Sequence, residues 1–126
     1  MAKTDKKILL VDDNDDCREM LALFIKRLGY QVLEAGTGVH AVDRASSTRP
    51  DLIMMDLCLP VMNGDEATAC LKANVYTRDI PVLINGASSI SDVHKKRLLA
   101  TGASEILQKP LNLSKLPTIL TRYLAR

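Results

Sequence analysis

Short aliphatic runs alternate with longer amphipathic segments along the whole chain. The runs carry β-branched and aliphatic residues with few charges, which is typical of strands buried on both faces of a parallel sheet. They occupy residues 7–11, 31–34, 52–55, 82–84 and 104–107. The pattern therefore predicts five strands, the second of which is weak because it holds only two strongly apolar residues.

The intervening segments repeat their apolar residues at steps of three and four, the spacing of one helix face. The first predicted helix contains Cys17, Met20, Leu21, Phe24 and Leu28, and Gly29 follows it as a natural stop. Three more predicted helices follow: one on Val39, Val42 and Ala45 that ends before Pro50, one on Ala67, Cys70 and Leu71, and one capped by Ser91 or Asp92 that ends at Gly102.

The last predicted helix carries Leu113, Leu116, Leu120, Tyr123 and Leu124 on one stripe. Its start is open because Pro117 interrupts a helix that begins at Asn112 but fits the first turn of one that begins at Ser114. We favour the later start.

Strands that alternate with helices predict right-handed crossovers and a parallel sheet covered by helices on both faces. The length of 126 residues suits one domain, and no repeat or linker divides it. We expect a single domain over residues 1–126, with residues 1–6 as a flexible N-terminus.

Composition narrows the function classes. The net charge is +2 and aromatic residues make up 3%, which disfavours direct nucleic-acid binding. No apolar run is long enough for a membrane span, and no signal peptide precedes the first strand. Three cysteines, Cys17, Cys58 and Cys70, form no CxxC pair, so we read them as small core or loop fillers and expect a reducing, cytoplasmic location.

Charged residues stand where three strands end. Asp12 and Asp13 follow the first strand, Asp56 ends the third, and Lys109 follows the fifth. Ligands of such sheets bind at the carboxyl ends of the strands. Clustered carboxylates repel one another, and Mg²⁺ with a lysine would neutralise them and let one carboxylate attack phosphorus.

A plainer interpretation applies to each residue alone. Acids before a helix often act as caps or dipole partners, which suits Asp15 and Asp16. Asp56 by itself would start a turn equally well, and Lys109 by itself is an ordinary solvated charge. Only the combination favours a phosphoryl-transfer site.

Several pieces of the sequence together resemble the receiver domain of two-component response regulators over essentially the full length. The pieces are Ile8–Asp13, Pro50–Leu57, Leu59–Gly64, Ile80–Val82, Gly102–Ala103 and Lys109–Pro110. Each is weak alone, but their order and spacing are specific. The resemblance implies a flavodoxin-like (βα)5 doubly wound sheet of strand order 2-1-3-4-5.

The resemblance also implies roles for individual residues. Asp56 would accept a phosphoryl group from a phosphohistidine of a sensor histidine kinase or histidine phosphotransfer protein. Asp12, Asp13 and Asp56, with the backbone carbonyl of Cys58, would hold Mg²⁺. Lys109 would pair with Asp56 and then with the phosphoryl group, which the backbone of Ala87 would also contact. The Lys109–Pro110 bond would be cis.

Two positions depart from the family pattern. Gly86 stands where the family has Thr or Ser, and Ile106 stands where it has an aromatic residue. A hydrogen bond to a charged group is worth about 1.5–3 kcal/mol, so the phosphorylation-driven population shift is expected to weaken. Ser88 or Asn85 is a candidate substitute donor.

Three alternatives compete with this interpretation. A pseudo-receiver that acts only as an interaction module suits the altered switch positions but not the retained carboxylates. An aspartate-nucleophile phosphatase needs an acid where Cys58 stands, and a flavodoxin-like cofactor carrier needs a phosphate-cradling loop where Asp12–Asp16 would repel phosphate.

Output is expected through a partner protein, because no second domain is present in this sequence. The fourth helix, fifth strand and fifth helix form the family's usual output face. Lys95, Lys96 and Arg97 lie on that predicted fourth helix, although we favour the simpler interpretation of a solvated helix face.

Overall fold

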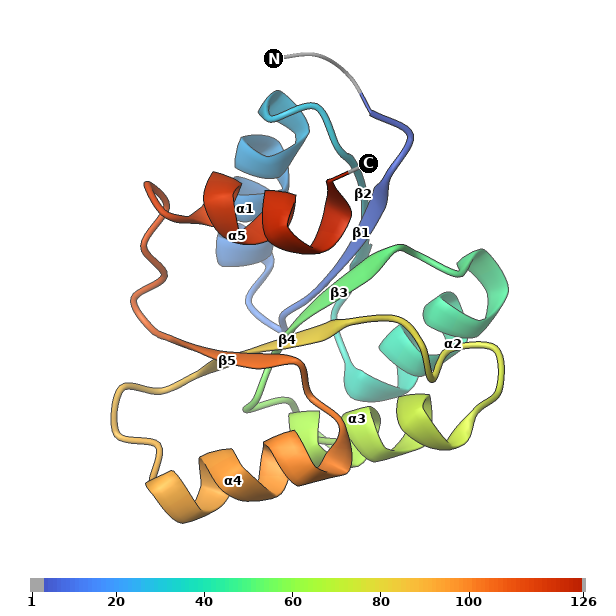
Figure 1. Ribbon diagram of the computed structural model, residues 1–126, viewed down its shortest axis with the longest axis vertical. Coiled ribbons are helices and arrows are strands. Elements are labelled where there is room, and N and C mark those ends of the chain that lie inside the picture. The colour runs from blue at the N-terminus through green and yellow to red at the C-terminus, as the bar shows by residue number, and fades with distance from the viewer. Residues whose placement is uncertain (1–3, 126) are drawn as a thin grey trace.

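The computed structural model describes residues 4–125, which form five parallel strands and five helices in strict alternation (Figure 1). In chain order these are β1 Lys7–Val11, α1 Asp15–Arg27, β2 Gln31–Ala35, α2 Gly38–Thr48, β3 Leu52–Asp56, α3 Gly64–Ala73, β4 Val82–Gly86, α4 Asp92–Thr101, β5 Glu105–Gln108 and α5 Leu116–Leu124. The predicted elements are all present.

The sheet has the order β2-β1-β3-β4-β5, which confirms the predicted doubly wound topology. All four pairings are parallel, and Leu9 of β1 faces Leu33 of β2 and Ile53 of β3. The carboxyl ends of β1, β3 and β4 therefore meet at one edge.

Two helix layers cover the sheet, with α1 and α5 on one face and α2, α3 and α4 on the other (Figure 1). Strand alternation divides the core between them. Leu10 and Met54 pack toward α1 and α5, whereas Leu9 and Ile53 pack toward the other three helices. The side chains of β3 are buried on both faces, as its unbroken apolar run predicts.

Helix ends follow local chemistry. The side chains of Asn14, Thr37, Asn63 and Ser91 each accept a backbone N–H in the first turn of their helices. Gly29 and Gly102 end α1 and α4 with φ of 106° and 126°, a region that favours glycine. Of the two predicted caps for α4, Ser91 is the one the structure has.

The start of α5 corrects one expectation. Pro117 lies in the first turn, as the later start requires, but neither Ser114 nor Asn112 caps the helix. Lys115 precedes it with no side-chain cap, and the Asn112 side chain instead accepts the backbone N–H of Ser114 at 3.0 Å. The turn that Asn112 closes shifts the helix start toward Leu116.

The N-terminus is described only from Thr4 onward. Residues 1–3 of the expected flexible N-terminus lie outside the described residues, while Thr4 donates a backbone hydrogen bond to Gly29 at 2.9 Å. Flexibility of residues 1–6 stays a prediction. Within residues 4–125, no helix combines the length and apolarity that crossing a membrane requires.

Candidate phosphoacceptor site

The acidic cluster forms because β1 and β3 are neighbours in the sheet. Asp12 follows Leu10 by two residues and Asp56 follows Met54 by two, so both side chains continue the face that α1 and α5 cover. One carboxylate oxygen from each of Asp12, Asp13 and Asp56 lies within 4.8 Å of the others. The structure thus brings together the three acids that the sequence singles out.

Lys109 completes the cluster from beyond β5. Its Nζ donates to Asp56 Oδ2 at 2.8 Å, and its backbone N–H donates to the carbonyl of Gly86 at 2.8 Å. The Asp56 side chain is only 7% exposed whereas that of Lys109 is 45% exposed, so the ion pair spans the boundary between core and solvent. The Lys109–Pro110 bond is cis, the isomer that the resemblance implies.

Asp56 strengthens the preference of Lys109 for its charged form. Burial by itself lowers the pKa of the Lys109 ammonium, but its hydrogen bond to Asp56 and the negative charge of that carboxylate outweigh the effect, and the pKa is raised above its ordinary value. The other carboxylate oxygen of Asp56, Oδ1, accepts the backbone N–H of Cys58 at 3.2 Å. Both oxygens of this buried carboxylate therefore have a donor.

The loop after β1 separates cap residues from cluster residues. Asn14, rather than Asp15 or Asp16, caps α1, and the two acids occupy its first turn as dipole partners. The backbone N–H of Asn14 donates to Asp12 Oδ1 at 2.9 Å, which orients that carboxylate. Asp15 is occupied elsewhere, in an ion pair with Arg18 at 2.8 Å.

Arg18 is a site-supporting residue that sequence reasoning missed. Its Nη1 donates to the backbone carbonyl of Asp12 at 2.6 Å, and its Nε pairs with Glu34 of β2 at 3.0 Å. No motif marks it, because its role depends on the approach of β2 to the first turn of α1. Arg18 fixes the loop that carries the acidic cluster.

The donor set fits a hard divalent cation. Three carboxylates share the site with one lysine ammonium, which leaves negative charge uncompensated. Carboxylate and carbonyl oxygens are the ligands that Mg²⁺ prefers, and the partial exposure of Asp12 and the exposure of Asp13 leave room for its waters.

The surroundings of Gly86, which follows the register partner of Asp56 in β4, are apolar. Ile106 of β5 pairs with Ile84 of β4, and a Cβ built on Gly86 would lie 3.3 Å from Ile90 Cδ1 and 3.6 Å from Ile106 Cγ2. Two isoleucines therefore cover the position where the family carries a hydroxyl. The sequence did not reveal Ile90, because its contact arises from the fold of the β4–α4 connection.

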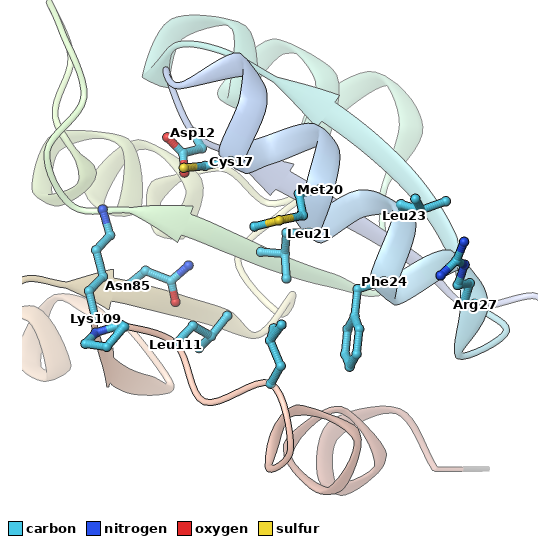
Figure 2. Close-up of a pocket in the computed structure, with 12 residues that line it drawn as sticks. Asp12, Cys17, Met20, Leu21, Leu23, Phe24, Arg27, Asn85, Lys109 and Leu111 are labelled. Atoms are coloured by element: carbon cyan, nitrogen blue, oxygen red, sulfur yellow. The ribbon is translucent and has the colours of Figure 1, made fainter.

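Asn85 lies in register with Asp56, and its Oδ1 is buried without a hydrogen-bond partner among the described residues. Together with Asp12 and Lys109 it lines a groove of about 500 Å³ between α1 and the β5–α5 connection (Figure 2). Ser88, the other candidate donor, is exposed on the β4–α4 connection, next to Ala87.

All three cysteines are free and exposed. The interpretation as core fillers is therefore wrong for Cys17 of α1 and Cys70 of α3, whereas Cys58 lies on the loop after β3, as the loop alternative allows. Cys17 lines the groove beside Met20, and Cys58 follows the phosphoacceptor candidate by two residues.

Known proteins share both the sequence and this architecture. The family model for the response regulator receiver domain matches residues 8–121. The phosphate regulon transcriptional regulatory protein PhoB of Pseudomonas aeruginosa is 36% identical over 121 residues, which are 96% of this chain and 52% of PhoB. The chain thus spans about half of that relative. The polar-differentiation response regulator DivK of Brucella anthropi is 30% identical, over 94% of this chain and 96% of DivK.

Solved structures agree with these relatives. Chemotaxis protein CheY4 of Vibrio cholerae superposes with a TM-score of 0.88 at 31% identity, covering 96% of this chain and all of CheY4. The receiver domain of sensor histidine kinase PA1611 from Pseudomonas aeruginosa has a TM-score of 0.85 at 32% identity, covers 95% of this chain and 98% of its own, and has a magnesium ion in its active-site cleft. With a matched family model over nearly all of its length and the same sheet order, the chain belongs to the response regulator receiver domain family.

Proposed function

We propose that this receiver domain accepts a phosphoryl group on Asp56, with Mg²⁺ held at the same site, and passes the signal to a partner protein. The observation that carries the proposal is a buried carboxylate, Asp56, that pairs with Lys109 at 2.8 Å and lies within 4.8 Å of two further acids. A pure interaction module has no physical need to hold three mutually repelling carboxylates within 4.8 Å.

Asp56 is the nucleophile in this proposal. One of its carboxylate oxygens attacks the phosphorus of a phosphohistidine, the bond from phosphorus to the donor nitrogen breaks, and its electron pair stays on the imidazole. Lys109 is the group that meets the charge on the transferred phosphoryl oxygens, since its ammonium is already within hydrogen-bond distance of Asp56.

Asp12, Asp13, Asp56 and the backbone carbonyl of Cys58 are the proposed metal ligands. When bound, Mg²⁺ supplies positive charge that shields Asp56 from its acidic neighbours and stabilises charge on the phosphoryl oxygens. The backbone N–H donor of Asn14 and the support of Arg18 hold the Asp12 end of this ligand set in position.

The conformational response is proposed to be weaker than in relatives that carry a hydroxyl and an aromatic residue. Gly86 has no side chain, so no hydroxyl extends from that position toward the phosphoryl group, and Ile90 and Ile106 lie close to where its Cβ would be. Backbone contact through Ala87 would remain. Asn85 and Ser88 are the polar side chains nearest along β4 and its connection, and they are the substitutes we propose to test.

The proposed phosphoryl donor is a sensor histidine kinase or a histidine phosphotransfer protein, and the proposed output is a downstream protein target. Lys96 and Arg97 are exposed on α4, which with β5 and α5 forms the proposed output face. We propose no direct contact with nucleic acid or membrane, and a cytoplasmic setting.

Labelling with acetyl phosphate and Mg²⁺ tests the proposal. We expect the wild type to gain the mass of one phosphoryl group and Asp56→Asn to gain none, because the amide is not a nucleophile of this kind. Asp43→Asn, an exposed acid on α2, is the matched control and should label like the wild type. An unlabelled wild type, with its fold intact, would favour the interaction-module alternative.

A further inference from the structure

The outer side of α1 exposes large apolar side chains. Met20 is 65% exposed and Leu23 is 51% exposed, although the opposite side of the same helix buries Ala22 and Ile25 completely or nearly so. Figure 2 shows Met20 and Leu23 on the helix above the groove. The functional site accounts for neither side chain.

These two residues belong to a longer stripe, which we call the α1 stripe: Asp16, Met20, Leu23 and Arg27. All four residues are exposed, and their spacing of four, three and four residues puts them on one side of the helix. The stripe has an acid at one end, an apolar centre and a base at the other end. This pattern is typical of a helix face that packs against a second helix.

The α1 stripe is complementary to itself when reversed. Asp16 precedes Met20 by four residues and Arg27 follows Leu23 by four, so a second α1 helix running antiparallel would set its Arg27 against Asp16 and its Leu23 against Met20. A parallel second helix would instead oppose acid to acid and base to base.

A flanking pair repeats this arrangement. Glu19 and Lys26 are exposed, lie seven residues apart and therefore stand on the same side of the α1 stripe. In the antiparallel arrangement Glu19 of one copy comes near Lys26 of the other. The acidic first half and basic last turn of α1 thus match at two positions.

We infer that the α1 stripe is a docking surface for a second copy of this chain, in an antiparallel, two-fold symmetric pair. A two-fold contact uses the same patch on both copies, which a self-complementary stripe satisfies. Leu113, which is 38% exposed across the groove from α1, adds apolar surface beside the second helix.

The pairing affects the site next to it. The groove beside the α1 stripe ends at Asp12 and Lys109, so a second copy on α1 narrows the approach to Asp56 from that side (Figure 2). Only this consequence rests on the proposed phosphoacceptor function. The pairing itself depends on α1 alone.

Sedimentation velocity of the full chain, from micromolar to millimolar concentration, measures the pairing without using phosphorylation. We expect a concentration-dependent dimer. Asp16→Arg and Arg27→Asp should each raise the dissociation constant about tenfold, because the symmetry repeats each like-charge contact twice. The double variant Asp16→Arg/Arg27→Asp should return to the wild-type value, and added salt should weaken both.

Two matched controls separate this surface from general charge effects. Asp43→Arg on α2 and Lys96→Asp on α4 reverse exposed charges elsewhere and should leave the dissociation constant unchanged. Far-ultraviolet circular dichroism checks that every variant keeps its helices. Leu23→Ser, which removes apolar area at the centre of the stripe, should leave a monomer.

A wild type that is monomeric at all concentrations overturns the inference. A dimer whose dissociation constant is unchanged by both single charge reversals overturns it as well. A double variant that fails to recover rules out the antiparallel arrangement. A monomer whose Met20 and Leu23 methyl signals shift only when a helical phosphodonor protein is added would assign the α1 stripe to that protein instead.

Discussion

The two sides of the candidate site, one around Asp56 and the other around Gly86, differ sharply in chemistry. On one side lie Asp12, Asp13 and Lys109, with an ion pair of 2.8 Å and an oriented carboxylate. On the other side, Ile90 and Ile106 pack over the bare backbone of Gly86. The first side is charged and partly exposed to solvent. The isoleucines of the second side pack against the core that the sheet forms with α2, α3 and α4.

In the proposed function, this contrast separates two roles of one site, namely phosphoryl acceptance and the conformational response. Accepting a phosphoryl group depends on nucleophile, cation and lysine, which are all on the charged side. Reporting the phosphoryl group to α4 depends on the β4–β5 side, where the hydrogen-bonding partner of the family pattern is replaced by apolar contacts. We therefore expect chemistry and conformational response to be separable by mutation.

The largest effect is expected on the charged side. Lys109→Met keeps most of the length of the side chain but removes the charge proposed to meet the phosphoryl oxygens, and we expect the rate of labelling by acetyl phosphate to fall about 100-fold. Lys96→Met, on exposed α4, should label at the wild-type rate. A comparable loss in both variants would remove the special role of Lys109.

On the apolar side, the informative variant restores the hydroxyl and the aromatic residue of the family pattern. In Gly86→Ser/Ile106→Tyr, the new hydroxyl can bond a phosphoryl mimic, and one charged hydrogen bond of about 1.5–3 kcal/mol shifts a two-state population by about one to two powers of ten. We expect amide signals of α4 to move further on adding beryllofluoride and Mg²⁺ than in the wild type.

Wild-type amide shifts that already reach α4 at full amplitude would contradict this prediction. Ser88→Ala and Asn85→Ala then identify a substitute donor: the variant that reduces the wild-type shifts lacks it. The contact of 3.3 Å expected between a Cβ at position 86 and Ile90 requires Ile90 to move slightly, so circular dichroism should accompany the spectra.

The affinity for Mg²⁺ should depend on Asp12 more than on an acid outside the cluster. Asp12→Asn removes a charge from the cluster, and we expect the apparent affinity for Mg²⁺ to fall about tenfold or more. Asp43→Asn is the matched control, since Asp43 is an exposed acid on α2 that lies outside the cluster. The thermal shift caused by Mg²⁺ measures both. Equal losses would indicate diffuse negative charge rather than defined ligands.

The smallest effect concerns the hydrogen bond that joins α5 to β5 at Glu105, the residue before Ile106. Tyr123 donates its hydroxyl to Glu105 at 2.8 Å, and Tyr123→Phe should lower the free energy of unfolding by about 1 kcal/mol at neutral pH. Burial, with the hydrogen bond and charge of Glu105, raises the pKa of Tyr123 above 10.0.

Because the folded protein favours the neutral phenol, this contribution is fully present below pH 10.0 and is lost as the pH rises through the raised pKa of Tyr123. Urea unfolding of both proteins on either side of that pH should show the difference shrinking at high pH. A difference that is constant with pH would mean that packing, not the hydroxyl, carries the effect.

Sequence reasoning worked best where the signal is local or repeated. The unbroken apolar run of β3 and the stops at Gly29 and Gly102 follow from side-chain burial and backbone conformation, and the elements they define are all present. The start of α5 was predicted wrongly, because the turn at Asn112 competes with a cap, and so was the burial of Cys17 and Cys70, because small size does not require burial.

The candidate site was predictable only in part. The position of Asp12, Asp56 and Lys109 at strand ends follows from the order of the elements, because parallel strands bring their carboxyl ends to one edge. Arg18 and Ile90 were not predictable, since each acts through a contact between segments whose approach no local pattern encodes.

By itself, then, the sequence determined the alternation of strands and helices, the family, and the acids and lysine available at one edge. Only the tertiary structure decided which of these groups touch, that Lys109 pairs with Asp56, and that isoleucines fill the space over Gly86. The physical reason is range: periodicity and backbone preferences act within a few residues, whereas contacts and burial depend on how distant segments pack.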